Sequence, residues 1–554
     1  MSVDTAAPVQ AGELPRTVGF RGLMLISLGS IIGSGWLMAA LDSSKEAGPA
    51  AIISWILCAV LFAFLALCYA ELGATYPVAG GTGRFPFFSH GRVVGFLSSW
   101  SSWLQAVLIA PVEIIAAVSY LNGLHSVNKH FPMLNNQGLL NLRGILVGLA
   151  AMVVFTAINL AGGKFMSESN TIMMIWKTAI PLLAVVVVLY ESHHLGNLNN
   201  AHAGGFAPDG IHGILSALPA AGVAFALQGF EQAAQLAGEA KNPGKDLSKA
   251  IIVAMVIGAG IYALLEVAFV LGVSPSDIAH GWQTPLGVAN ANTSSAWYTL
   301  AEAVGVTWLG TLLIADAVIS PSATGVVYMG TTSRLTYNLG KEPEMPGFLS
   351  KVSPNGVPVN AIIASAIIGC IGFGPFKSWS VIVNMVTAFT AIMYGFAPIA
   401  LAGLHKKDPD RARAYTMPIP KVLLPIGFIS ANFLIYWGGW DNTWKLMIVL
   451  VLGLILFAIG SRRAADPFDG VKNAVWVPVW LAGTAVIGYL GRYGAGTDPD
   501  HDGHLNWLPN YVDLGVVIVF SLVIFFWAVN CTRTAEQVQR AIDADLGRTD
   551  LLSE

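Results

Sequence analysis

The chain has 554 residues, of which 55% are hydrophobic and 11% are charged, and its mean hydropathy is +0.64. Soluble domains average about 25% charged residues, so this composition excludes an ordinary soluble domain and indicates a protein that crosses a lipid bilayer many times. The net charge is −3 and there is no basic domain, which argues against nucleic acid as a partner.

The chain begins with a polar arm, residues 1–18, which has no signal-peptide core. A membrane crossing needs roughly 20 apolar residues, so the remaining sequence predicts an all-α polytopic membrane protein with about fourteen helices. The predicted spans are 19–41, 49–72, 94–121, 141–161, 168–190, 212–237, 248–273, 299–330, 359–376, 379–404, 421–440, 444–461, 473–491 and 511–531. Lysine and arginine gather in alternate loops, which predicts that the arm and the tail, residues 532–554, are both cytoplasmic in a plasma (inner) membrane.

The first span contains the sequence Gly29-Ser30-Ile31-Ile32-Gly33-Ser34-Gly35-Trp36. Unpaired backbone groups at mid-membrane depth are tolerated only where they line a polar cavity, so the small residues predict a broken helix that unwinds near Ser34. The freed N–H groups and the positive end of the following half-helix suit a substrate carboxylate. The alternative is that the small residues only allow two helices to pack closely.

The sixth span has a second interruption, centred on residues 225–231 and about five helices after the first. Five helices invert the topology, so residues 19–404 are predicted to form a ten-helix core of two inverted halves, 19–190 and 212–404. Residues 421–531 add four helices. Trp36, Phe225 and Phe230 flank the breaks and could cover a ligand, although packing is the commoner role of such residues.

Lys177 is the most informative ionisable residue because an ammonium inside a span is costly and normally faces a partner or a cavity. It is predicted to couple transport to protons by bonding to carbonyls at the first break and to the hydroxyls of Ser320, Ser322 and Thr324. The alternative is a lysine whose ammonium reaches the cytoplasmic interface.

Five acids in or near the spans have open roles. Glu113 is equally a proton carrier, an amine contact or a structural hydrogen-bond partner, and for Asp316 the structural role is slightly favoured. Glu71 and Glu239, at predicted cytoplasmic helix ends, are candidates for the inner gate, or simply solvated helix ends. Glu231 follows the second break, where freed carbonyls should bind a substrate ammonium, and it either assists or faces a vestibule.

The broken first helix occurs together with Tyr69-Ala70-Glu71-Leu72-Gly73, Lys177 and Ala237-Gly238-Glu239-Ala240-Lys241-Asn242-Pro243. With this ordered set the chain resembles the amino acid-polyamine-organocation superfamily of permeases. The further sequences Phe87-Phe88-Ser89-His90-Gly91, Gly281-Trp282, Thr331-Thr332-Ser333-Arg334-Leu335 and Tyr436-Trp437 make it most similar to the aspartate-proton symporter branch.

The resemblance implies alternating access around a site between the two broken helices. It implies that the substrate carboxylate meets Ile32, Gly33, Ser34 and Gly35, and that its ammonium and side chain meet Phe225, Ala226, Gln228 and Gly229. It also implies that Lys177 replaces the sodium ion of sodium-coupled relatives. Gln228 and Glu231 depart from what an aspartate carrier needs, because an acidic side chain wants a cation and only Lys177 lies within a span.

The sequence therefore predicts a proton-coupled symporter of aspartate or another amino acid. The runner-up is an amino acid or polyamine exchanger, and a sensor or channel built on the same fold is a more distant alternative. No nucleophile set, P-loop lysine or metal-ligand cluster is seen, so we expect neither enzymatic activity nor a cofactor beyond the proton gradient. The expected partners are an amino acid, protons and lipid, and the oligomeric state stays open.

Overall fold

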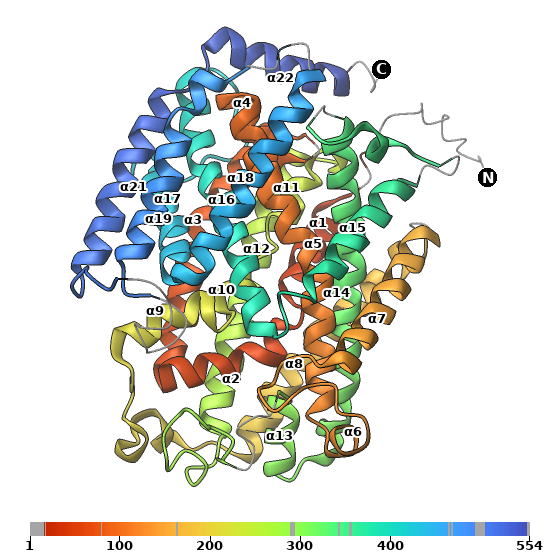
Figure 1. The fold of residues 1–554 in the computed structure, drawn as a ribbon, viewed down its shortest axis with the longest axis vertical. Coiled ribbons are helices and arrows are strands. Elements are labelled where there is room, and N and C mark those ends of the chain that lie inside the picture. The colour runs from red at the N-terminus through yellow and green to blue at the C-terminus, as the bar shows by residue number, and fades with distance from the viewer. Residues whose placement is uncertain are drawn as a thin grey trace.

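The computed structural model describes residues 16, 18–78, 80–161, 164–288, 294–341, 344–353, 357–463, 466, 469–493 and 505–550. Most of these residues lie in helices that run along the long axis of one bundle (Figure 1). Within these ranges β-structure is limited to two isolated bridges, Val18 with Ala240 and Leu134 with Leu140. The predicted all-α fold is confirmed.

The α-helices are α1 (Phe20–Ile31), α2 (Gly35–Ala47), α3 (Ala51–Thr75), α4 (Gly81–His90), α5 (Arg92–Asn122), α6 (His125–His130), α7 (Leu142–Ala161), α8 (Lys164–Glu191), α9 (Gly210–Ala220), α10 (Val223–Leu227), α11 (Gln232–Gln235), α12 (Pro243–Gly272), α13 (Ala296–Ala303), α14 (Thr307–Lys341), α15 (Val359–Gly372), α16 (Trp379–Lys407), α17 (Pro420–Trp437), α18 (Trp440–Gly460), α19 (Trp476–Leu490), α21 (Val512–Asn530) and α22 (Ala535–Asp550). The short 3-10 helices are η1 (Gly48–Ala50), η2 (Leu195–Asn199), η3 (Ala201–Ala203), η4 (Ala237–Glu239), η6 (Gly347–Ser350), η7 (Ser461–Arg463) and η8 (Val471–Ala474).

Eleven helical segments among the described residues are long and apolar enough to cross a membrane. Three further apolar helices, Phe20–Ile31, Gly210–Ala220 and Val359–Gly372, are shorter. The first two of these are pieces of broken helices, because α1 continues into α2, and α9 is followed by α10 and α11. Each predicted span therefore has a helical counterpart.

The prediction of one long helix over 299–330 is wrong. The structure has a short helix, α13, and a separate long one, α14, with Gly305 between them in the left-handed region at φ 83°. A left-handed glycine ends a helix readily because it has no Cβ. Arg334 and Lys341, which the sequence assigns to a loop, lie on α14, since a hydropathy window does not register the polar end of a helix.

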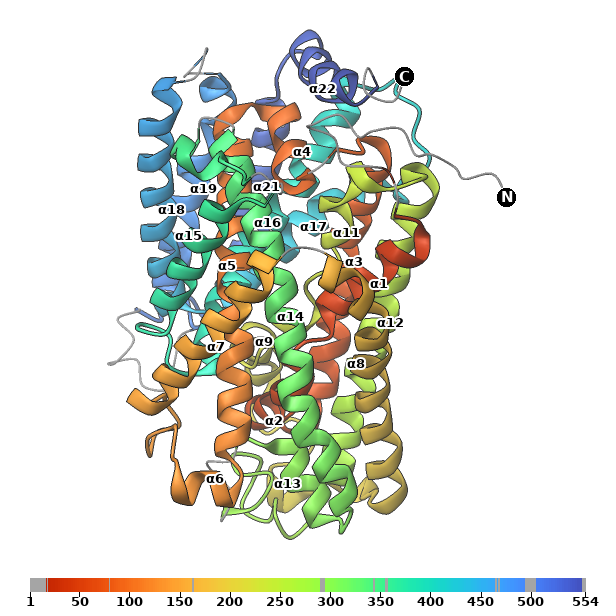
Figure 2. The ribbon, with the colours of Figure 1, turned by 90° about the vertical axis from the view of Figure 1, so that its right-hand side faces the viewer.

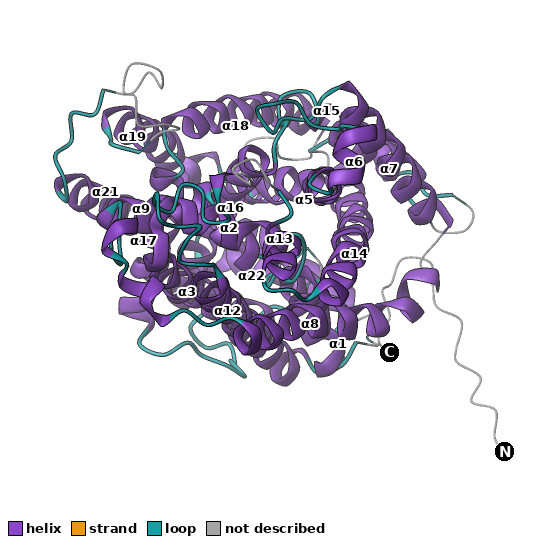
Figure 3. Cartoon of the chain, turned by 90° about the horizontal axis from the view of Figure 1, so that it is seen from below, coloured by secondary structure: helices purple, strands orange, loops and turns teal. Residues whose placement is uncertain are grey.

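The bundle has two ends, which we call the α22 end and the α13 end. α4 and the crosswise helix α22 lie at the first, and α6 and α13 lie at the second (Figures 1 and 2). The last four long helices, α17, α18, α19 and α21, pack against one another. Seen along the bundle, α19 and α21 lie on the side away from α7 and α14 (Figure 3). The broken helices are held in the interior by α3, α8, α12 and α16, and α5 reaches the first break through Glu113.

Candidate functional site

The first helix is broken where the glycines and serines predict it. α1 ends at Ile31, Ile32 is extended with φ −87° and ψ 98°, and α2 begins at Gly35. Ile32 and Ser34 are both fully buried. The predicted unwinding near Ser34 is confirmed.

The second break follows α10. Gln228 is extended, with φ −75° and ψ 162°, and Gly229 has a φ of 116°, which favours glycine. A Cβ on Gly229 would lie 2.8 Å from the carbonyl carbon of Ser30, and one on Gly35 would lie 2.7 Å from the Cβ of Ala226. The two breaks are therefore in direct contact.

We expect Gly229→Ala to lower amino acid uptake by at least about fivefold, because the left-handed backbone and the contact with Ser30 each oppose a side chain. Uptake per folded molecule in reconstituted vesicles measures this effect. Gly260→Ala is the matched control, since Gly260 lies on an exposed position of α12 with nothing within 4 Å of an added Cβ. Equal uptake by the two variants would contradict the close contact of the breaks.

Side chains from three surrounding helices satisfy the peptide groups released at the first break. The Ser34 N–H donates to Glu113 Oε2 of α5 at 2.9 Å. The Ile31 carbonyl accepts from the Tyr262 hydroxyl of α12 at 2.9 Å. Unsatisfied backbone groups cost several kcal/mol in an apolar medium, so these contacts stabilise the broken helix.

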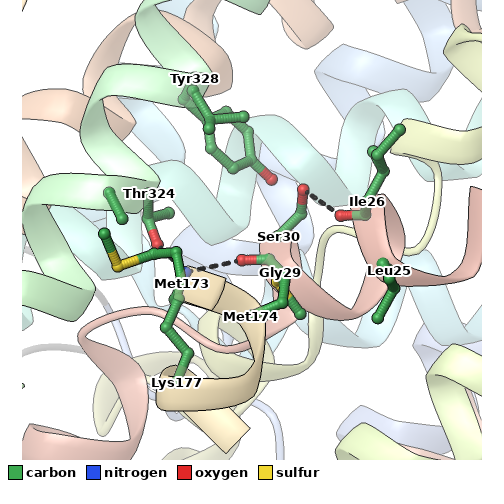
Figure 4. Close-up of a pocket in the computed structure, with 11 residues that line it drawn as sticks. Leu25, Ile26, Gly29, Ser30, Met173, Met174, Lys177, Thr324 and Tyr328 are labelled. Atoms are coloured by element: carbon green, nitrogen blue, oxygen red, sulfur yellow. Dashed lines mark hydrogen bonds between the residues drawn. The ribbon is translucent and has the colours of Figure 1, made fainter. Parts of the chain in front are cut away.

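Lys177 of α8 provides the third of these contacts. Its ammonium donates to the Gly29 carbonyl at 2.9 Å and to Thr324 Oγ1 at 2.5 Å, and the side chain is 2% exposed. Figure 4 shows the lysine of α8 and the threonine of α14 meeting beside α1. The amine does not reach an interface, which argues against the alternative of a snorkelling lysine.

The other two hydroxyls predicted to meet Lys177 do not bond to it. Ser320 donates to Asp316 at 2.5 Å, and Ser322 is only half-buried and makes no recorded bond to the amine in the part of the chain that the structure describes. Residues two apart on a helix point roughly 200° away from one another, so Ser322 cannot share the face of Thr324.

A cavity of about 40 Å³ adjoins Lys177 between α1, α8 and α14 (Figure 4). Methionines and aliphatic residues form much of its wall, and Ser30, Thr324 and Tyr328 add hydroxyls. A water needs about 10–15 Å³ of such space, so the cavity has room for a few waters beside the ammonium. It is too small for an amino acid.

Indole N–H groups close the break toward the α13 end. Asp316 accepts from Trp36 Nε1 at 3.2 Å and from Trp176 Nε1 at 2.7 Å, which ties α2 and α8 to α14. Trp297 of α13 donates to the Trp36 carbonyl at 2.8 Å. Asp316 thus has the contacts of a structural residue. Trp36 is bonded to α13 through its carbonyl and is part of this closure.

Trp379 of α16 completes the closure and is not among the site residues that the sequence predicts. Its indole donates to Ser34 Oγ at 3.1 Å, and its ring meets that of Phe225 edge-on, with centroids 5.8 Å apart. Gly222 makes room for it, because a Cβ there would lie 2.5 Å from the indole. Phe230, by contrast, packs among aromatic side chains and stacks on Tyr394 with centroids 5.0 Å apart.

The same face of α16 contacts the second break. Thr390 donates to Gln228 Oε1 at 2.7 Å, and Tyr394 donates to Glu231 Oε2 at 2.6 Å. The Gly229 N–H donates to the same Glu231 oxygen at 2.9 Å. Trp379, Thr390 and Tyr394 follow helical spacing, and this polar and aromatic stripe in an apolar span is the signal that could have identified them.

The two candidate gate acids lie at the α22 end. Glu71 of α3 is fully buried; its Oε1 lies 2.5 Å from His405 Nε2 and 3.3 Å from Arg413 Nε, and its Oε2 accepts from the Met417 N–H at 2.8 Å. Glu239 pairs with Arg334 of α14 at 3.7 Å, but Arg334 is 63% exposed, so this pair contributes little.

We expect Glu71→Gln to destabilise the fold by on the order of 3 kcal/mol, because it leaves the guanidinium of Arg413, which is 12% exposed, without a counter-charge. The midpoint of thermal unfolding in detergent should fall, whereas Glu302→Gln, at an exposed position of α13, should leave it unchanged. An unchanged midpoint for both variants would contradict the importance of this ion pair.

Comparison with known proteins places these features in context. Residues 18–459 match the family model described as amino acid permease. The glutamate/serine transporter AimA of Bacillus subtilis (strain 168) is 34% identical over 533 residues, which are 96% of this chain and 96% of that protein. The aspartate-proton symporter of the same organism is 30% identical over 524 residues, 93% of this chain and 96% of that protein. Its branched-chain amino acid permease BcaP is 28% identical over 477 residues, 83% of this chain and 97% of that protein.

Proposed function

This chain belongs to the amino acid permease family, and we propose that it is a proton-coupled amino acid symporter that works by alternating access. As a member of that family it is a multi-pass membrane transporter and not an enzyme. We place it in the plasma (inner) membrane with the α22 end, and both termini, in the cytoplasm. Basic residues of that end, among them Arg84, Arg413 and Arg533, support this orientation.

One observation supports proton coupling: the buried carboxylate of Glu113 already occupies the first break. The N-terminus of α2 suits a substrate carboxylate, but the Ser34 N–H there is bonded to Glu113. Gly33 lets this acid approach closely, since a Cβ there would lie 2.7 Å from Glu113 Oε1. A substrate carboxylate would meet an ionised Glu113 as a like charge, and a proton on Glu113 removes that repulsion.

Lys177 contributes to the same step. Its ammonium bridges Gly29 of α1 and Thr324 of α14, and its charge strengthens both bonds, so a protonated amine holds α1 against α14 more firmly than a neutral one. The cavity beside it supplies room for the water that would carry a proton away. Substrate and proton then favour the same conformation, which is what coupling requires.

The test is uptake of radiolabelled amino acids into proteoliposomes, with a proton gradient imposed or collapsed. We expect accumulation only when the gradient is present. Accumulation that ignores the gradient but requires an amino acid inside the vesicle would make the chain an exchanger. Single-channel currents, or binding without accumulation, would contradict a carrier altogether.

A further inference from the structure

Two buried polar side chains beside the second break lack hydrogen-bond partners. The amide nitrogen of Gln228 and the hydroxyl of Thr387 are both enclosed and unpaired within the described part of the chain. The two residues are only 3% and 2% exposed. Buried polar groups nearly always have a hydrogen-bond partner, so two such groups without one beside a break need an explanation.

Both groups belong to the surface that surrounds the breaks. Gln228 is the first residue of the second break, and its amide oxygen is held by Thr390. Thr387 lies one helical turn before Thr390 on α16, between that residue and Trp379, whose indole bonds to Ser34. Residues three apart share a helix face, so Thr387 faces the same region as Thr390.

Thr387 differs from Thr390, the other threonine of α16. The single hydroxyl proton of Thr390 has two acceptors within reach, Gln228 Oε1 at 2.7 Å and the carbonyl four residues earlier at 2.9 Å. The hydroxyl of Thr387 bonds to neither kind of acceptor. It therefore has no partner within the described residues.

The charges at the second break disfavour an acidic ligand side chain. Glu231 lies there, buried, and accepts from the Gly229 N–H. Lys177 is committed to Gly29 and Thr324. A second carboxylate on the substrate would be desolvated beside the carboxylate of Glu231, which is unfavourable.

We propose that Gln228 and Thr387 bind the side chain of the substrate, and that the substrate is an amino acid with an uncharged hydroxyl or carboxamide side chain. This inference rests on the proposed transport function. A hydroxyl or carboxamide on the substrate can donate and accept hydrogen bonds. The side chain of serine, threonine, asparagine or glutamine would therefore pair with both Gln228 and Thr387. An aliphatic side chain would leave them unpaired.

The test measures uptake of L-serine, L-asparagine, L-alanine, L-valine and L-aspartate by the full-length protein in proteoliposomes under one proton gradient. Serine or asparagine should be preferred over alanine and aspartate by at least about tenfold, since leaving buried groups unpaired is costly. Preference for aspartate or valine overturns this inference and leaves amino acid transport standing. Uptake of none of them overturns the transport function itself.

Substitutions then assign the preference to the two residues. Thr387→Val and Gln228→Leu should each lower the ratio of serine to alanine uptake by at least about fivefold. Thr387→Ser should restore the ratio. The matched control is Thr484→Val, another buried threonine with an unpaired hydroxyl, on α19, which packs against α17, α18 and α21. A ratio unchanged in Thr387→Val and Gln228→Leu, or lowered equally in the control, would overturn the assignment.

Discussion

Replacing Lys177 by alanine should abolish accumulation of substrate against a proton gradient and spare exchange of substrate for substrate. The ammonium bridges α1 and α14 through Gly29 and Thr324, and without it protonation no longer biases the position of α1. Loss of a coupling free energy of this kind changes the affinity by up to about 150-fold. Proteoliposomes loaded with or without substrate separate the two activities.

Lys177→Met distinguishes lost charge from lost packing, because methionine keeps an unbranched chain and fills the same space. We expect it to fail in accumulation as the alanine variant does. The alanine variant should also bind substrate less tightly, since it leaves the Gly29 carbonyl without its partner. Unimpaired accumulation in either variant would remove this lysine from the coupling mechanism.

Replacing Glu113 by glutamine should make substrate binding independent of pH. The wild-type protein should bind more tightly as the pH falls, because a proton on Glu113 frees the substrate carboxylate from a like charge at the Ser34 N–H. Glutamine resembles the protonated acid at every pH, so tight binding should persist at high pH while accumulation is lost. Binding measured by calorimetry or thermal shift across a pH series gives both results.

Glu266→Gln is the matched control for this prediction. Glu266 of α12 is also fully buried, but it accepts from Ser43, Ser44 and Trp55, away from the peptide groups of the breaks. Its substitution should leave the pH dependence of binding intact. A pH dependence kept by Glu113→Gln, or lost equally in Glu266→Gln, would contradict the role given to Glu113.

The first break and the bonds of Lys177 could be predicted because each depends on a short stretch of sequence. Three glycines and two serines in an apolar span predict either a break or close helix packing, and the structure unwinds at Ile32–Ser34. A lysine in mid-span must find carbonyls or hydroxyls, and Lys177 finds Gly29 and Thr324. Each inference needed only the cost of unsatisfied polar groups in lipid.

The remaining features depend on distant parts of the chain and could not be predicted from local sequence. Glu113 lies 79 residues from Ser34 in the sequence, and Trp379 lies 345 residues away from it. Only the positions of α5 and α16 beside the first break decide that these side chains, and not others of the same type, reach it. The choice of Thr324 over Ser322 likewise depends on the rotation of α14.

The most direct test of the account is to measure proton movement caused by substrate alone. Proteoliposomes with a pH-sensitive dye inside, a clamped membrane potential and no imposed pH gradient receive the preferred amino acid from outside. We predict that the interior acidifies as the amino acid enters, and that neither Lys177→Ala nor Glu113→Gln supports this acidification. Entry of the amino acid into wild-type vesicles with no change in internal pH would contradict it.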